Sequence, residues 1–327
     1  MYAGTERIIW SLAVELSKLG HTVTLVAPRG SRAPPNGELL ETVDPSFNFQ
    51  TETSAFGMYT PRLNALEWDI VHDSSFMLHS YMAKVNKPEI RLLATLHSHP
   101  TSRNPPPVPK PNLVCLSNSH ALMTSASLGV PVKFVHNGID LDHYPLVDVE
   151  EKGSRALYLG RMARFKGPHV AIDLAERYRF PCDIVGEDRF VNDPPYVHSL
   201  MSSCRAMARY WGEVSEAKKV ELLSRAKALI FPAMWSEPFG LTAVEAMACG
   251  TPVVALDYPL SAISEIVDDG VNGFLCRTPE EMPKALERVG EIDPKKCRET
   301  VEKKFTSRIM GQAYESLYRE ILEGREW

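Results

Sequence analysis

Long apolar runs are absent from this sequence of 327 residues, and so is an excess of basic charge. No stretch approaches the ~20 apolar residues that a membrane-spanning helix needs, and the first residues lead into an amphipathic pattern rather than a signal peptide. The 36 Lys and Arg residues stand against 41 Asp and Glu residues, a net charge of −5 that gives no reason to expect nucleic-acid binding. We therefore expect a soluble, cytoplasmic protein.

Cysteine pairs and dinucleotide-binding glycines are lacking too. The six cysteines include no C-x-x-C pair and are scattered over Cys115, Cys182, Cys204, Cys249, Cys276 and Cys297. This spacing fits reduced thiols better than a zinc site or a disulfide framework. No G-x-G-x-x-G follows a predicted strand, which argues against an NAD-dependent dehydrogenase.

The apolar segments that are present predict strands alternating with helices. Strands are expected at 21–28, 69–73, 91–97, 113–118, 133–138, 155–160, 182–187, 228–233, 251–256 and within 265–276. Helices are expected at 5–19, 75–85, 119–128, 168–178, 217–226, 241–250 and 303–322. This alternation indicates an α/β fold with mostly parallel sheets. The length and the polar, acidic stretch 140–154 suggest two doubly wound, Rossmann-like domains facing across a cleft.

The segment AMWSEPFGLTAVEAMACGTPVVA, residues 233–255, places two carboxylates around the start of a predicted helix. Glu237 precedes that helix and Glu245 lies about one turn inside it. The free amides at the helix start, those of Gly240, Leu241 and Thr242, favour an anion. Two carboxylates would repel a bare phosphate but accept hydrogen bonds from hydroxyl groups. A ligand that carries phosphate between two polyols is a nucleotide sugar.

A second segment, LGRMARFKG at residues 159–167, also follows a predicted strand. Arg161 and Lys166 can both reach an anion at that strand end, Arg161 with two parallel hydrogen bonds and Lys166 as a point charge. Gly4, just before the first predicted helix, would let the backbone approach a phosphate closely.

Each of these residues also has a simpler interpretation. Glu237 could cap the helix, Glu245 could be a solvated helix residue, and Arg161 and Lys166 could be surface charges. His97 could be an ordinary loop histidine or, with its neighbour His99, half of a metal site, although no third ligand has a useful spacing.

The D-x-D triplet of Asp140 and Asp142 is a motif that binds Mn²⁺ in GT-A glycosyltransferases. Here it follows HNGI at the expected domain boundary, so we interpret it as a turn and expect no metal.

The motifs together resemble the retaining GT-B glycosyltransferases of family GT4. The resemblance covers nearly the whole chain and is carried, in order, by YAGTERIIWSLAVELSKLGHTVTLVAP, HNGID, GRMARFKG, SEPFGLTAVEAMACGTPVVA and EIVDDGVNGFLC. It implies an N-terminal acceptor-side domain at 1–146, a nucleotide-sugar-binding domain at 147–303 and a helix at 304–327 that crosses back to the first domain. The family usually has a first strand and a Gly-Gly pair where this chain begins with YAG, so a first strand is expected to be missing.

The resemblance also implies residue roles. Arg161 and Lys166 would hold the donor diphosphate, Glu237 would bind the sugar hydroxyls and Glu245 the ribose hydroxyls. His97, with His99 as a rival, would lie near the transferred sugar. The remaining donor-binding positions are Gly4, Gly212, Val214, Phe239, Gly240, Leu241 and Thr242.

The implied activity is retaining, metal-independent transfer of a hexosyl group from a nucleotide sugar to a hydroxyl acceptor. The nucleotide sugar, a UDP-, GDP- or ADP-hexose, would be a co-substrate, and no other cofactor is expected. Residues 1–150 hold 11 Lys and Arg against 14 Asp and Glu, which favours a soluble sugar or small-molecule acceptor over a membrane surface. A non-catalytic nucleotide-sugar-binding protein or partner subunit is the alternative; an epimerase or a phosphorylase fits less well.

Overall fold

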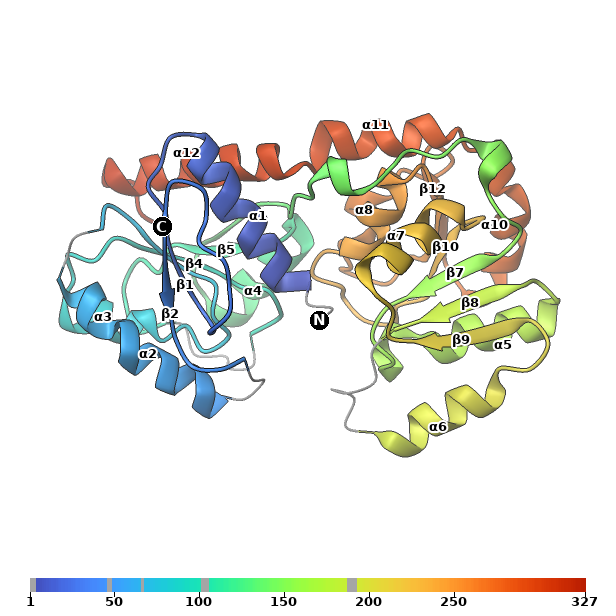
Figure 1. The fold of residues 1–327 in the computed structure, drawn as a ribbon, viewed down its shortest axis with the longest axis horizontal. Coiled ribbons are helices and arrows are strands. Elements are labelled where there is room, and N and C mark those ends of the chain that lie inside the picture. The colour runs from blue at the N-terminus through green and yellow to red at the C-terminus, as the bar shows by residue number, and fades with distance from the viewer. Residues whose placement is uncertain (1–3, 46–48, 66–67, 101–105, 187–192) are drawn as a thin grey trace. The chain divides into compact units, whose positions relative to one another are not determined.

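The computed structural model describes residues 4–45, 49–65, 68–100, 106–186 and 193–327 (Figure 1). Its internal contacts divide these residues into two units. The C-terminal unit consists of Gly4 and Ile139–Thr306, and the N-terminal unit consists of Thr5–Gly138 together with Ser307–Trp327. Residues 2 and 3 of the YAG segment lie outside the described residues.

The C-terminal unit is built on a six-stranded parallel sheet with the order β12-β11-β10-β7-β8-β9 (Figure 1). The strands are β7 (Ala156–Leu159), β8 (Cys182–Val185), β9 (Ala208–Gly212), β10 (Leu229–Phe231), β11 (Val253–Leu256) and β12 (Gly273–Cys276). The chain runs outward from β7 to β9, returns to β10 beside β7, and then runs outward in the other direction. The boundary between β7 and β10 is therefore a topological switch point, where ligands of such sheets collect at the carboxyl ends of the strands.

The helices of this unit cover a sheet whose strands, apart from the edge strand β9, are almost entirely buried. They are α5 (Pro168–Tyr178), α6 (Pro194–Ser203), α7 (Glu216–Arg225), α8 (Leu241–Ala248), α9 (Ile263–Ile266), α10 (Met282–Arg288) and α11 (Pro294–Lys304). Helix α8 packs with α7, α9 and α11, whereas α5 packs on β8 and β9. All four residues of β7, β8 and β11 are buried, as expected for parallel strands covered on both faces.

The N-terminal unit contains two separate parallel sheets. Four strands pair in chain order, namely β3 (Val71–Asp73), β4 (Leu92–Thr95), β5 (Leu113–Cys115) and β6 (Val132–Phe134). A two-stranded sheet is formed by β1 (Thr24–Ala27) and β2 (Glu38–Glu41). The helices are α1 (Gly4–Lys18), α2 (Phe49–Asn64), α3 (Ser80–Asn86), α4 (Asn118–Leu128) and α12 (Ser307–Leu322).

The expected α/β class with two Rossmann-like units is confirmed. The predicted helix 303–322 is wrong at its start, because α11 ends at Lys304 and α12 begins at Ser307. Between them Phe305 leaves the helical conformation, and its carbonyl accepts a hydrogen bond from the amide of Ile139 at 2.9 Å. Several elements were not predicted, namely strands β2 and β9 and helices α2, α6, α9, α10 and α11.

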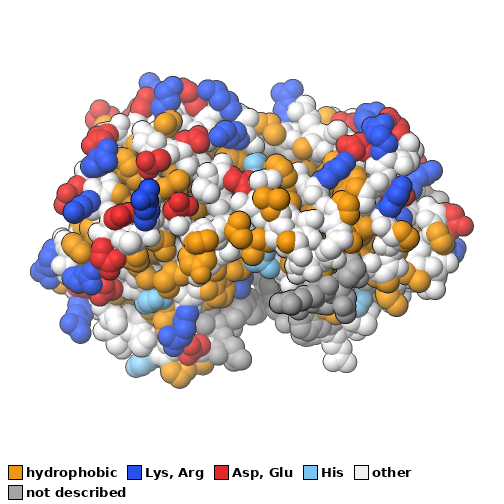
Figure 2. Space-filling view, turned by 180° about the vertical axis from the view of Figure 1, so that it is seen from behind, with side chains coloured by type: hydrophobic (Ala, Val, Ile, Leu, Met, Phe, Trp, Pro, Cys, Tyr) orange, Lys and Arg blue, Asp and Glu red, His pale blue; other side chains and the backbone are white. Residues whose placement is uncertain are grey.

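No helix in the described ranges is long and apolar enough to cross a membrane. On the face seen in Figure 2, basic and acidic side chains are interspersed rather than gathered into one continuous basic field.

Candidate active site

Two loops pack together where β7 and β10 end. The amide of Met234 donates to the carbonyl of Phe165 at 2.8 Å. Gly167 has φ 75°, and a Cβ atom there would lie 2.2 Å from the carbonyl oxygen of Pro232. Only glycine meets both conditions without strain. The Lys-Gly pair is therefore what allows the loop that carries Lys166 to pack against the loop that carries Glu237.

Lys166 and Glu237 form an ion pair in these loops. Lys166 Nζ lies 2.5 Å from Glu237 Oε2, and Trp235 Nε1 donates to the same oxygen at 2.7 Å. No donor in the described ranges reaches Glu237 Oε1, and the residue keeps 8% of its surface exposed. One oxygen of the carboxylate is thus fixed by two donors, while the other can accept a hydrogen bond from a ligand hydroxyl. The sequence placed these two residues on different parts of one ligand; the structure brings them into direct contact.

Aromatic rings flank the Lys166 ammonium. It lies 4.8 Å from the ring centroid of Trp235 and 5.8 Å from that of Phe165, and the two rings are 4.8 Å apart. Rings at these distances attract a cation. Trp235 was not predicted, although an indole two residues before a predicted sugar-binding carboxylate is a possible N–H donor.

Helix α8 begins next to this carboxylate. Its N-cap is Gly240, with φ 106° and no side-chain cap, so the interpretation of Glu237 as a helix cap is wrong. The amides of Leu241 and Thr242 have no acceptor among the residues that the structure describes, which leaves them available to an anion. Phe239 is 3% exposed and packs edge-on against Phe305, with 5.8 Å between ring centroids.

Glu245 lies one turn into α8 and is fully buried, so the interpretation as a solvated residue is wrong as well. Its Oε1 accepts hydrogen bonds from Tyr144 Oη at 2.8 Å and from Lys219 Nζ at 3.0 Å. Lys219 was not predicted. Its signal was a lysine four residues before Leu223, on the face of α7 that is buried.

Arg161 lies in the loop after β7, immediately after Gly160. It is exposed, and its guanidinium makes no ion pair within the described part of the chain. Its carbonyl accepts a hydrogen bond from Tyr158 Oη at 2.9 Å. Tyr158 is 2% exposed, and burial raises the pKa of its phenol well above the ordinary value, so it remains a neutral donor. The backbone of this loop is thereby fixed while the Arg161 side chain remains available to an anion.

Strand β9 carries the expected nucleobase segment. Gly212 ends the strand with φ 67° and accepts a hydrogen bond from the amide of Gly186 at 3.0 Å. Val214 is half-buried in the loop before α7, whose N-cap is Ser215. Gly4 groups with this unit, and a Cβ atom there would lie 3.2 Å from Leu241 Cδ2.

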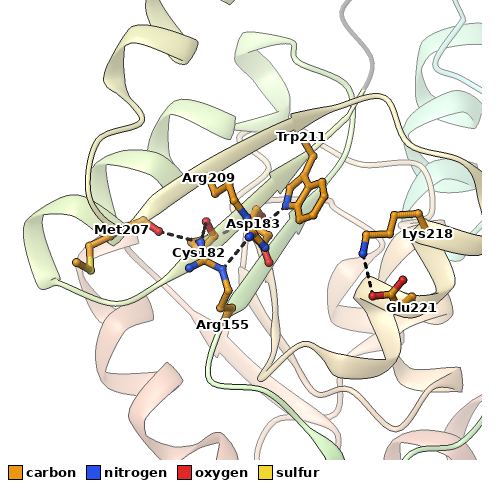
Figure 3. A network of polar contacts seen from close by, with 8 residues as sticks. All are labelled: Arg155, Cys182, Asp183, Met207, Arg209, Trp211, Lys218 and Glu221. Carbon is orange, nitrogen blue, oxygen red and sulfur yellow. Dashed lines mark hydrogen bonds and ion pairs between the residues drawn. The ribbon is translucent and has the colours of Figure 1, made fainter.

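A buried aspartate ties β9 to the sheet (Figure 3). Asp183, on β8, is 4% exposed. Its Oδ1 accepts hydrogen bonds from Arg155 Nε at 2.9 Å, Arg209 Nε at 2.9 Å and Trp211 Nε1 at 3.0 Å. Since Trp211 immediately precedes Gly212, this network positions the end of the edge strand.

The predicted histidines lie in the N-terminal unit. The Nε2 atom of His97 is buried and has no hydrogen-bond partner among the described residues, and burial lowers the pKa of this side chain to about 4. His99 packs edge-on against His120, with ring centroids 4.9 Å apart. No three His, Cys, Asp or Glu residues in the described ranges are grouped to hold a metal ion. Asp140 caps a short 3₁₀ turn by accepting from the amide of Asp142 at 3.1 Å, as expected for a turn.

Comparison with known proteins finds a matching protein family for each of the two units. Residues 147–305 match the family model of glycosyl transferases group 1, and residues 2–143 match that of glycosyltransferase family 4. The chain is 31% identical over 155 residues to a glycogen synthase of Mycobacterium tuberculosis, covering 44% of this chain and 36% of that protein. It therefore spans little more than a third of that relative's length.

Two further similarities extend over most of the chain. It is 26% identical over 303 residues to a phosphatidyl-myo-inositol mannosyltransferase of Mycobacterium tuberculosis, which covers 83% of this chain and 78% of that one. The structure of Anabaena HepE in complex with UDP-glucose superposes with a TM-score of 0.73 at 16% identity, covering 99% of this chain and 97% of that one.

Two Rossmann-like units of this kind, shared with solved glycosyltransferases, define the GT-B class. The two family models together account for most of the chain, which belongs to the group 1, family 4 glycosyltransferases. The resemblance to the GT-B glycosyltransferases of family GT4 found in the sequence is confirmed.

Proposed function

We propose that this enzyme transfers a hexosyl group from a nucleotide sugar to a hydroxyl acceptor, with retention of the anomeric configuration and without a metal ion. The observation that carries the proposal is the carboxylate of Glu237. Lys166 and Trp235 hold one of its oxygens, and the other is open to a hydroxyl beside the start of α8. A sugar bound there through its hydroxyls would place its phosphate near the uncapped helix amides.

The leaving group in this reaction is a nucleoside diphosphate, whose negative charge grows as the glycosidic bond breaks. Arg161, Lys166 and the amides of Leu241 and Thr242 supply positive charge and hydrogen-bond donors around the switch point. Removing one such donor typically costs about 3–4 kcal/mol of transition-state stabilisation. Four of them can replace a metal ion as the counter-charge.

The donor class has independent support. The Anabaena structure was solved with UDP-glucose, and several relatives are named for sugar transfer or polysaccharide synthesis. We extend this to a UDP-, GDP- or ADP-hexose as the donor here, and to a soluble sugar or small molecule as the acceptor. Glu245 would bind the ribose, and Gly212 and Val214 the nucleobase. Gly4 and Phe239 would contribute to donor binding, and His97 would act near the transferred sugar.

The decisive experiment measures nucleotide release from UDP-, GDP- and ADP-hexoses over a panel of acceptors, with and without EDTA. We expect release with one donor, unchanged by EDTA, and an α-linked product from an α-linked donor by NMR. An EDTA-sensitive reaction, or a product of inverted configuration, would refute the corresponding part of the proposal. Tight donor binding without turnover on any acceptor would favour the non-catalytic alternative.

Variants in the two loops that carry Lys166 and Glu237 test the roles of these residues. Lys166→Met should lower kcat by about 10²–10³-fold, the usual effect of losing one such donor, and Glu237→Gln should abolish most turnover. Arg164→Met is the matched control, because its side chain is 66% exposed and pairs with Asp193 at 3.0 Å. Equal losses in the control and in Lys166→Met would count against the role of Lys166.

A further inference from the structure

Glu245 is a charged residue in a helix that is apolar on all sides. Its neighbours Ala243, Val244, Ala246, Met247 and Ala248 are each 0% exposed, and so is Glu245 itself. An ionised carboxylate in such surroundings is costly unless a counter-charge and hydrogen bonds accompany it. A buried ion pair contributes little net stability compared with well-packed apolar side chains, so its presence here calls for a functional reason.

Lys219 supplies the counter-charge from another helix. Its side chain is 0% exposed, and Nζ lies 3.0 Å from Glu245 Oε1 and 2.6 Å from Glu216 Oε1. Glu216 lies in the first turn of α7, where its side chain is 47% exposed. The ammonium group is therefore shared between an inner carboxylate on α8 and an outer carboxylate on α7.

Tyr144 approaches the same carboxylate oxygen from outside both helices. Its hydroxyl donates to Glu245 Oε1 at 2.8 Å. Arg298 fixes the backbone of Tyr144, because its Nη1 donates both to the Tyr144 carbonyl at 2.6 Å and to the Ala248 carbonyl at the end of α8 at 2.9 Å. Two donors from separate elements thus fix the orientation of the Glu245 carboxyl group.

We propose that Lys219 is a positioning residue for Glu245, and that it sets the affinity and the ribose selectivity of nucleotide binding. This inference rests on the proposed function, in which Glu245 accepts hydrogen bonds from the ribose hydroxyls. A carboxylate that accepts from a ribose must keep its charge and a fixed rotamer while buried. Lys219 offsets the charge and, with Tyr144, fixes the rotamer. Without the ammonium group, the carboxylate loses its orientation and with it the ability to distinguish ribose from 2′-deoxyribose.

The test measures nucleotide binding by calorimetry. UDP, GDP and ADP are titrated first, and the tightest binder is then compared with its 2′-deoxy form. We expect the wild-type protein to prefer the ribonucleotide. Lys219→Met should weaken ribonucleotide binding about tenfold and bring the two dissociation constants close together, and Glu245→Gln should have the same effect. Lys219→Arg, which keeps the charge, should retain part of the preference.

Lys303→Met is the control, because Lys303 is 73% exposed on α11 and pairs only loosely with Glu299, at 3.4 Å. It should bind like the wild type. Should Lys219→Met fail to fold, the double variant Lys219→Met/Glu245→Gln removes both buried charges. We expect it to melt close to the wild type yet to bind as weakly as Glu245→Gln.

The outcomes distinguish a failure of the proposed function from a failure of the role assigned to Lys219. If no nucleotide binds the wild type, the proposed function and this inference both fall. If Glu245→Gln weakens binding while Lys219→Met and Lys219→Arg keep the wild-type affinity and ribose preference, the role of Lys219 is wrong and the proposed function stands. A double variant that regains stability and also the ribose preference overturns the inference too.

Discussion

Gly167 and Pro232 are in contact so close that no side chain fits between them: a Cβ atom on Gly167 would lie 2.2 Å from the Pro232 carbonyl oxygen. This contact brings the loop after β7 against the loop after β10. The ion pair between Lys166 and Glu237 depends on this close approach of the two backbones. A substitution at Gly167 therefore tests how the site is assembled.

Gly167→Ala should destabilise the C-terminal unit by about 2 kcal/mol or more, because it combines a left-handed φ with a backbone clash. For a unit of this size we expect the melting temperature to fall by about 4–8 °C, together with a loss of activity. Gly290→Ala is the control, since a Cβ atom there meets nothing within 4 Å. Equal melting temperatures for the two variants would show that the close contact between the two loops is not needed for stability.

Trp235→Phe should lower kcat/KM for the donor by about 10- to 100-fold, because it removes a hydrogen bond to a charged group while keeping the ring beside Lys166. The melting temperature should change little. Trp327→Phe is the matched control, because it also removes one indole hydrogen bond: Trp327 Nε1 donates to the Leu113 carbonyl at 3.0 Å in the N-terminal unit. It should reduce stability without changing the donor KM. Unchanged kinetics in Trp235→Phe would mean that Lys166 alone orients the carboxylate.

The sequence was most informative where chemistry and turn geometry coincide. The sequence predicted a site at the ends of β7 and β10 from the glycines, the lysine and the acids that follow these strands. Parallel strands present their carboxyl ends at one edge of the sheet, which brings such residues together. The ion pair of Lys166 with Glu237 was not predictable, since it depends on how closely two loops approach. Their separation is set by Gly167 and Pro232, which lie 65 residues apart in the numbering.

The missed residues share a physical reason. Lys219 and Tyr144 act through side-chain packing between elements. The helical spacing of Lys219 and Leu223 hints that the lysine is buried but not which carboxylate it meets, and nothing in the local sequence distinguishes Tyr144 from a core tyrosine. The division of the N-terminal strands into two sheets depends on long-range pairing of the same kind. The helix break at Phe305 follows from its hydrogen bond with Ile139, a contact between distant segments that helical periodicity cannot reveal.

Folding stability should depend on pH through His120. This residue is 1% exposed; Nδ1 accepts from the Leu116 amide at 3.3 Å, and Nε2 lies 3.2 Å from the Ser98 carbonyl. Burial, followed by the nearby His99, lowers its pKa from 6.5 to about 3. The unfolded chain therefore binds more protons below about pH 6.5, and the free energy of unfolding should decrease as the pH falls from there toward 3.

Between pH 7 and pH 5 this histidine alone should remove about 2 kcal/mol from the free energy of unfolding, measured in urea. His120→Gln should show a smaller pH dependence even where it is less stable overall, whereas exposed His198→Gln should behave like the wild type. The same pH dependence in His120→Gln and the wild type would show that other groups dominate.

Asp183 is expected to matter far more than the arginines that surround it. Asp183→Ala removes the acceptor of two guanidinium groups and one indole, so it should cost about 3–5 kcal/mol, the usual effect of breaking a buried charge pair. Arg209→Met should cost no more than about 1 kcal/mol, because Arg209 is 53% exposed. Urea unfolding of the two variants measures the difference.

The same pair of variants tests the function of β9. Since Trp211 connects Asp183 to Gly212, loss of the aspartate should also loosen the strand end that we assign to the nucleobase. Nucleotide affinity should therefore fall in Asp183→Ala at temperatures where the protein is still folded, and should remain near the wild-type value in Arg209→Met. Unaltered affinity in folded Asp183→Ala would separate the network from ligand binding and leave it a purely structural feature of the sheet edge.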